Sequence, residues 1–214
     1  MGQVISFINS KGGAGKTTLA FALATLWNKA GKRVLLVDTD PQGTLMQFYS
    51  VREDKGNMEA MSIGASLLER RIQRETKDGG FDFILIDTPG RLDEIKPAMV
   101  VANLVILPVQ SGGADFFSFK RIFQHVEALK VPCAIVPNRI KTETEIKTFE
   151  PTIMALTNGA AKIAPHMRDR VDHRQYTVQG LGLIDVGKPS DEGFKETIAL
   201  GAFIEEQLWQ NRNR

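Results

Sequence analysis

The chain has 214 residues, 27 basic and 25 acidic side chains, a formal net charge of +2 at pH 7 and one cysteine, Cys133. This length predicts a single domain, 1–214, that can bury a core without metal or disulfide staples. One cysteine excludes an internal disulfide, a CxxC redox motif and an iron–sulfur or zinc cluster of paired cysteines within one chain. The small net charge does not by itself indicate a nucleic-acid binder, so DNA binding would need a local basic patch.

Targeting signals are not evident in the sequence. The N-terminal segment lacks a basic region before its apolar run, as a secretion signal would require. No apolar run approaches the roughly 20 residues that span a bilayer. We therefore expect a cytoplasmic protein.

Short apolar runs alternate along the chain with segments of helical periodicity. The expected buried strands are 4–8, 33–37, 81–86, 104–109 and 132–136, with a weaker sixth at 183–186. The expected helices are 17–29, which ends before Gly31, and 191–209, while 50–80 is expected to be helical and charged. This alternation predicts an α/β fold with a mostly parallel twisted sheet and helices on both faces. Ligands of such sheets bind at the carboxyl ends of the strands.

A glycine-rich loop, SKGGAGKTT at 10–18, lies between the first strand and the first helix, as a Walker A phosphate loop requires. Glycines let the backbone wrap around phosphates, and the following helix directs its positive end at the same anion. The fold class is therefore expected to be a P-loop NTPase. Lys16 would reach the β- and γ-phosphates, Thr17 would bind Mg²⁺, and Thr18 would hold the α-phosphate. The expected nucleotide-binding residues of the loop are Gly12, Gly13, Ala14, Gly15, Lys16, Thr17 and Thr18.

The loop departs from the general GxxxxGK[ST] pattern at its start. Ser10 replaces the first glycine, and a second lysine, Lys11, precedes the glycine pair. Lys11 cannot easily serve the same phosphate from the same direction as Lys16. Its position makes sense if it reaches a nucleotide held by another subunit.

Carboxylates follow two of the expected strands. Asp38 and Asp40 close the run LLVDTDPQ, and their i, i+2 spacing at a strand end directs both into one cleft. Asp87 closes FDFILIDTPG, which has the form of a Walker B strand, and would accept from a magnesium-bound water and from the Thr17 hydroxyl. No glutamate follows Asp87 directly, so we expect slow intrinsic hydrolysis. Asp38 and Asp40 would otherwise only end the strand and cap a turn.

The sequence KGGAGKTT, together with VDTDPQ and DTPG, resembles the deviant Walker A ATPases of the ParA/MinD family, and the resemblance covers nearly the whole chain. It implies that Lys11 contacts the partner's phosphates across an ATP-sandwich dimer. It also implies that Asp40 positions the lytic water and Asp38 orients the magnesium shell, although the two roles can be exchanged. The expected cofactors are ATP and Mg²⁺.

The pair Asn138-Arg139 follows another strand. Similar Asn-Arg pairs in the family contact adenine, which favours ATP over GTP. The guanine-reading motif NKxD is absent, since Arg139 and Lys141 occupy its Lys and Asp positions. The alternative for Asn138 is a turn residue after Pro137.

Members of this family position cargo. The small plasmid-partition ParA proteins, which are ParF-like and lack an N-terminal helix-turn-helix extension, resemble this chain most. They bind DNA nonspecifically as ATP dimers on the nucleoid, and a ParB-like centromere- or cargo-binding partner stimulates hydrolysis. In the basic window 162–174, phosphate contacts would be sequence-independent. The expected DNA-binding residues are Arg168, Arg170, Arg174 and Lys188. The alternative is a solvated helix surface of mixed charge.

Two other functions remain open. A MinD-like membrane ATPase would anchor through its C-terminal tail, but Glu205 and Glu206 interrupt the tail FIEEQLWQNRNR. We expect the tail to pack against the sheet, because anchoring needs a larger apolar and basic face. A metabolic ligase of the same fold would lack the KGG lysine pattern.

Overall fold

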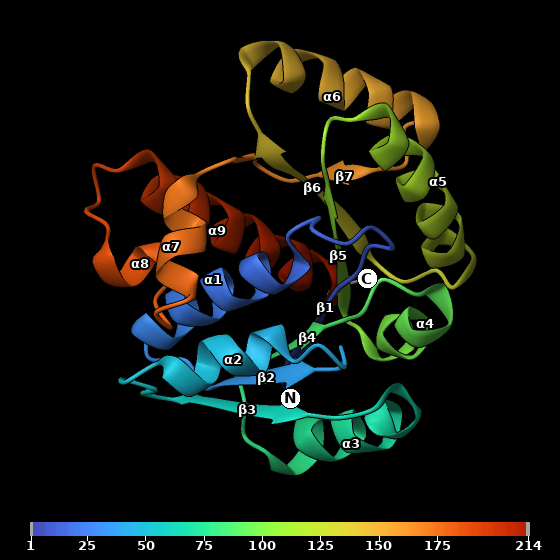
Figure 1. Ribbon diagram of the computed structural model, residues 1–214. Coiled ribbons are helices and arrows are strands. Elements are labelled where there is room, and N and C mark those ends of the chain that lie inside the picture. Colours follow the sequence, from blue (N-terminus) through green and yellow to red (C-terminus); the bar gives the residue numbers. More distant parts are fainter. Residues whose placement is uncertain (1, 213–214) are drawn as a thin grey trace.

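The computed structural model describes residues 2–212 and shows a twisted sheet between two layers of helices (Figure 1). The strand order is β3-β2-β4-β1-β5-β6-β7, with β8 paired to β6, and every pairing is parallel. The strands are β1 Gln3–Phe7, β2 Val34–Asp38, β3 Met58–Ser62, β4 Phe83–Asp87, β5 Leu104–Val109, β6 Cys133–Ile140, β7 Lys162–Ile163 and β8 Met167–Arg168. The predicted α/β fold with a parallel sheet is confirmed.

Most helices connect successive strands, three within the described residues follow β8, and together they cover both faces of the sheet (Figure 1). They are α1 Lys16–Lys29, α2 Thr44–Val51, α3 Ala65–Asp78, α4 Leu92–Val101, α5 Gly113–Ala128, α6 Glu143–Leu156, α7 Val171–Thr177, α8 Leu183–Val186 and α9 Glu192–Arg212. One face packs against α1 and α9. The other face packs against α3, α4, α5 and α6.

Alternate residues of each central strand enter opposite halves of the core. In β2, Leu36 packs with α1 and α9, whereas Leu35 packs with α3. Because both faces of the sheet are buried, its central strands carry continuous apolar runs. These runs made the central strands easy to recognise in the sequence. On the α1 face, the Trp27 ring stacks on Phe83 with centroids 4.0 Å apart.

Two sequence predictions are wrong. Residues 183–186 form the short helix α8 and not a strand. The segment 50–80 contains the strand β3 as well as α3. Because β3 is an edge strand with only Met58 fully buried, its sequence lacks a continuous apolar run. The basic window 162–174 comprises β7, β8 and the start of α7.

Helix α9 packs its apolar stripe against the sheet, as expected. Leu200, Ile204 and Leu208 are buried in the same cluster as the residues of α1. Glu205, an acidic interruption of the tail, accepts a hydrogen bond from Trp27 Nε1 at 2.6 Å. Within residues 2–212, no helix is long and apolar enough to cross a membrane.

The packing of α9 predicts a large difference between two isoleucines of this helix. Ile204 is fully buried and Ile198 is 43% exposed. We expect Ile204→Ala to lower the free energy of unfolding by about 2–5 kcal/mol through lost burial and a residual cavity. Ile198→Ala should change it by less than about 0.5 kcal/mol. Chemical denaturation measures both, and equal losses would contradict the observed docking of α9.

Candidate functional site

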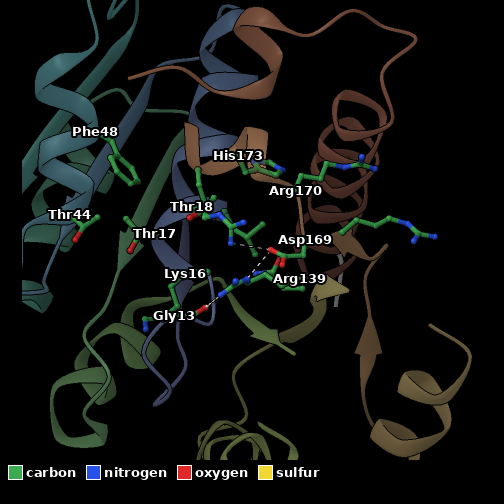
Figure 2. Close-up of a pocket in the computed structure, with 15 residues that line it drawn as sticks. Gly13, Lys16, Thr17, Thr18, Thr44, Phe48, Arg139, Asp169, Arg170 and His173 are labelled. Carbon is green, nitrogen blue, oxygen red and sulfur yellow. Dashed lines mark hydrogen bonds and ion pairs between the residues drawn. The ribbon is translucent and has the colours of Figure 1, made fainter. Parts of the chain in front are cut away.

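A pocket opens at the carboxyl ends of the central strands. The register pairs Asp87 of β4 with both Phe7 of β1 and Asp38 of β2, so these three strands end at the same level. The loop after β1 and the first turn of α1 form the floor of a cavity of about 290 Å³ (Figure 2). Its walls come from α2, the end of β6 and the segment 168–174.

The loop before α1 adopts a backbone that only glycine accepts readily. Gly15 is the N-cap of α1 with φ 96°, and Gly13 has φ 75°. A Cβ atom at Gly15 would collide with Asn138 Nδ2. Since the first amides of a helix lack intrahelical acceptors, the loop and α1 together make a site for an anion.

Three side chains brace the carbonyl groups of this loop. Asn138 Nδ2 donates to Ala14 O at 2.7 Å, and Gln110 Nε2 donates to Gly13 O at 2.9 Å. Arg139 Nη1 donates to Gly13 O at 3.3 Å. The amide nitrogen of Asn138 is thus engaged by the loop itself. Sequence reasoning assigned no role to Gln110, although its place directly after β5 gave the signal.

Lys16 is the first residue of α1 and is only 8% exposed. Burial lowers the pKa of its ammonium below the usual value, and the charges of Asp87 and Asp40 partly offset this effect. A buried cation at the mouth of an anion site is well placed for a phosphate, because a bound anion compensates the lost hydration.

Thr17 and Asp87 lie in direct contact, as the sequence predicts. Thr17 Oγ1 donates to Asp87 Oδ2 at 2.6 Å. Burial raises the pKa of Asp87 to about 7, with a smaller contribution from Asp38, against the lowering effects of the Thr17 hydrogen bond and Lys16. Within residues 2–212, Asp87 Oδ1 is buried and has no hydrogen-bond partner.

The donor set around Asp87 fits a magnesium ion. A hydroxyl and carboxylates are hard oxygen ligands, and the unpartnered Asp87 Oδ1 leaves one of them unused. In the described part of the chain, no three His, Cys, Asp or Glu side chains form a metal cluster. Mg²⁺ is usually held by one or two carboxylates together with phosphates and water.

Asp38 and Asp40 occupy different environments. Asp38 is fully buried, and its carboxylate accepts from the backbone amides of Asp40 at 3.0 Å and Met46 at 3.2 Å. Burial raises the pKa of Asp38, while these hydrogen bonds oppose the rise. Asp40 is only partly buried, and its carboxylate accepts from the amide of Gln42 at 2.9 Å. Asp40 is therefore the more accessible of the two.

Lys11 forms an ion pair within its own chain. Its Nζ lies 2.8 Å from the carboxylate of Asp115, whose side chain is 5% exposed, while that of Lys11 is 39% exposed. Asp115 stands in the first turn of α5. In the isolated chain, Lys11 is thus held beside its own phosphate loop.

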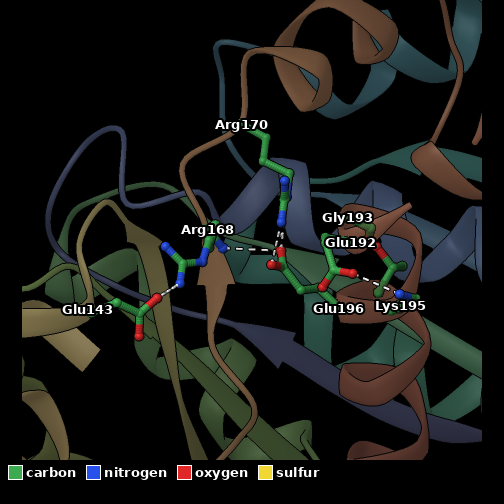
Figure 3. Close-up of polar contacts among 8 residues, drawn as sticks. Glu143, Arg168, Arg170, Glu192, Gly193, Lys195 and Glu196 are labelled. Atoms are coloured by element: carbon green, nitrogen blue, oxygen red, sulfur yellow. Dashed lines mark hydrogen bonds and ion pairs between the residues drawn. The ribbon is translucent and has the colours of Figure 1, made fainter. Parts of the chain in front are cut away.

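The predicted DNA-binding arginines lie at this pocket. Arg168, Arg170 and Arg174 line it together with Arg139. Arg170 binds Glu196 through two hydrogen bonds, and Arg168 pairs with Glu143 (Figure 3).

Asp169 also neutralises arginines of this group. Arg174 Nη1 lies 3.5 Å and Arg139 Nε 3.1 Å from Asp169 Oδ1 (Figure 2). Three carboxylates therefore form ion pairs with these four guanidinium groups. Lys188 lies apart from them on an exposed segment after α8.

Comparison with known proteins agrees with the fold and the loop. Residues 5–182 match the CobQ/CobB/MinD/ParA nucleotide binding domain family. Over 146 residues the chain is 31% identical to the chromosome-partitioning ATPase Soj of Thermus thermophilus, covering 55% of this chain and 57% of Soj. Over 119 residues it is 34% identical to the maintenance of carboxysome distribution protein A of Gloeobacter kilaueensis, covering 53% of this chain and 51% of that protein.

A solved structure shows the same fold. The septum site-determining protein MinD of Pyrococcus horikoshii, complexed with Mg-ADP, superposes with a TM-score of 0.80 at 19% identity, covering 99% of each chain. The architecture is that of a P-loop NTPase, and the chain belongs to the CobQ/CobB/MinD/ParA nucleotide-binding family. It spans between 51% and 64% of the length of the first curated relatives it matches.

The hydrogen bond from Asn138 to Ala14 O leads to a prediction that distinguishes two roles for Asn138, fixing the loop and contacting the base. If Asn138 mainly fixes the loop, Asn138→Ala should weaken binding of ATP and of inorganic tripolyphosphate together, by about tenfold, because a buried carbonyl loses its donor. Competition against a fluorescent nucleotide measures both affinities. A loss confined to ATP would instead show that Asn138 acts through the base.

Proposed function

We propose that the chain is a Mg²⁺-dependent, ParA-type ATPase with weak intrinsic activity. In this proposal it forms an ATP-sandwich dimer, binds DNA nonspecifically and positions a plasmid or other cargo. Hydrolysis is stimulated by a ParB-like partner. The observation that carries the proposal is the phosphate loop, which has two lysines, Lys11 and Lys16, together with the contact between Thr17 and Asp87. The names of relatives that partition chromosomes and distribute carboxysomes support a cargo-positioning role.

The proposed chemistry follows from the environments of the side chains. Lys16 binds the β- and γ-phosphates, because its buried ammonium needs an anion. Thr17 and Asp87 hold the metal, and bound Mg²⁺ would offset the negative charge of the phosphate oxygens. Asp40 is the better candidate to orient water. Its carboxylate is partly accessible, whereas both oxygens of Asp38 are committed to backbone amides.

Lys11 acts in trans in this proposal. Its ammonium is held by Asp115 in the single chain, so it must leave that carboxylate to reach a nucleotide in a second subunit. A cation supplied in this way neutralises charge that develops in the transition state of phosphoryl transfer. Hydrolysis is then coupled to dimerisation, which suits a switch.

In the proposed DNA binding, the arginines exchange their carboxylate partners for DNA phosphates, and this exchange makes DNA binding switchable. Arg168, Arg170 and Arg174 are each paired with a carboxylate, so their attraction to phosphates is reduced in the single chain. A dimer doubles any weak patch, and binding through phosphate contacts weakens as salt rises, more steeply the more contacts are made.

Two alternatives are weaker. A MinD-like membrane role would need a free amphipathic tail, whereas the apolar stripe of α9 is buried against the sheet. A metabolic ligase of this fold would not need Lys11.

Two lysine variants test the catalytic part of the proposal. Lys16→Ala should abolish nucleotide binding. Lys11→Ala should preserve ATP binding by the monomer but reduce turnover by about 10³-fold or more, as expected for loss of a trans cation. Lys120→Ala, an exposed lysine on α5, is the matched control. Unchanged turnover by Lys11→Ala would refute the role in trans.

A comparison of surfaces tests the DNA part. With ATP, the protein should bind random duplex DNA, and binding should weaken steeply as salt rises. It should not bind vesicles of anionic phospholipid. Cosedimentation with each partner, with ADP as the control nucleotide, measures the preference. Binding to vesicles in place of DNA would favour the membrane-associated alternative.

A further inference from the structure

The two side walls of the pocket come from segments far apart in the sequence. One wall is formed by Thr44 and Phe48 of α2, and the other by the segment 168–174 that leads into α7. Figure 2 shows Phe48 and Thr44 on one side of the loop, with His173 and Arg170 on the other. The space between them lies beyond the phosphate loop, where a base and ribose would extend from bound phosphates.

A buried ion pair joins these two walls behind the pocket. Arg52 is the C-cap of α2, and its guanidinium binds both carboxylate oxygens of Asp185 in α8, at 2.7 and 2.9 Å. The same guanidinium donates to Gly180 O at 2.8 Å, in the turn between α7 and α8. Asp185 also accepts from the amide of Gly182 at 2.8 Å. The C-terminal end of α2 is therefore fixed to α8 and to the turn between α7 and α8.

The close approach of the two backbones shows how tight this junction is. Gly180 has φ 72°, and a Cβ atom at this position would lie 2.5 Å from the amide nitrogen of Arg52. Glycine thus lets the turn after α7 rest directly on the end of α2.

Helix α2 is held at its other end by Asp38. The Asp38 carboxylate accepts from the amide of Met46 in the first turn of α2. Helix α2, Thr44–Val51, is therefore held by Asp38 at its first turn and by the Arg52–Asp185 ion pair at its C-terminal end. A shift at either end would displace Thr44 and Phe48.

The Arg52–Asp185 ion pair is largely buried, and this burial favours a role in fixing the separation of the elements that it joins. The side chains of Arg52 and Asp185 are 5% and 15% exposed. Within residues 2–212, Arg52 Nε is buried and has no hydrogen-bond partner. Buried ion pairs often stabilise no better than apolar residues of similar volume, because desolvation opposes their attraction. A directional contact is useful where two elements must keep a fixed separation.

We propose that the Arg52–Asp185 ion pair is a positioning element that holds the two walls of the pocket at the separation required by the base and ribose of the nucleotide. Arg52 and Asp185 act through Thr44, Phe48 and the segment 168–174 and do not touch the ligand. This inference rests on the proposed binding of ATP.

The test compares ATP with inorganic tripolyphosphate, which occupies the loop but has no base. Arg52→Met keeps an unbranched apolar side chain but removes the guanidinium and its charge, and Asp185→Asn keeps the shape of the aspartate. We expect each to weaken ATP binding by about tenfold, the scale of a lost preorganised contact, while tripolyphosphate binding stays within about twofold. The matched control is Arg71→Met, which removes the ion pair of an exposed arginine with Glu75 on α3.

A double variant separates positioning from stability. In Arg52→Met/Asp185→Leu, apolar packing replaces the buried charges, so the melting temperature should return toward that of the wild-type protein. ATP affinity should stay low if the pair positions the walls. Recovery of ATP affinity together with the melting temperature would overturn the proposal, as would parallel losses for both ligands in the single variants.

The Asn138→Ala variant provides the contrasting pattern, since a loop defect should weaken both ligands. Wild-type protein that binds tripolyphosphate but not ATP would overturn the positioning role and the proposed ATP specificity, while leaving the phosphate site intact. Wild-type protein that binds neither would overturn the proposed function itself.

Discussion

The charge of Asp87 at the end of β4 is the constraint on which the site depends. This carboxylate is almost completely removed from water, yet one oxygen is satisfied only by Thr17 and the other has no partner within the described residues. A buried anion of this kind is costly unless a cation compensates it. Lys16 provides part of the compensating positive charge. A Mg²⁺ ion, which the oxygen ligands around Asp87 fit, would provide the rest. The strand register, which brings Asp38 and Asp87 to the same level, creates this imbalance.

Electrostatic balance also explains the character of the arginines around the pocket. Four guanidinium groups would make a strong anion site if they were free, but Glu143, Asp169 and Glu196 neutralise most of their charge. His173 lies among them, buried, and burial lowers its pKa so that the neutral form is favoured. The wall is thus polar and rigid but carries little net charge, which is compatible with an uncharged base and ribose.

The sequence located the phosphate loop, the strand that precedes it and the Asp87 carboxylate because each has a strong local pattern. Glycines, a lysine and a threonine between an apolar strand and a helix leave few alternatives. The edge strand β3 and the helix α8 were missed because neither is enclosed on both sides. The contacts Lys11–Asp115, Asn138–Ala14 and Arg52–Asp185 join residues more than 100 positions apart. Nothing in a single sequence pairs such residues, since tertiary packing alone brings them together.

The central place of β1 has a consequence for how the protein folds. Its neighbours in the sheet are β4 and β5, which follow only after three and four helices along the chain. During synthesis, one edge of β1 therefore stays unpaired until Phe83–Asp87 has emerged and the other until Leu104–Val109 has emerged. The loop that follows β1 lacks its full set of braces until Asn138 has emerged. Such nonlocal parallel pairing slows folding and prolongs the exposure of apolar strand edges. The phosphate loop, near the N-terminus in sequence, thus depends for its final shape on residues that are synthesised much later.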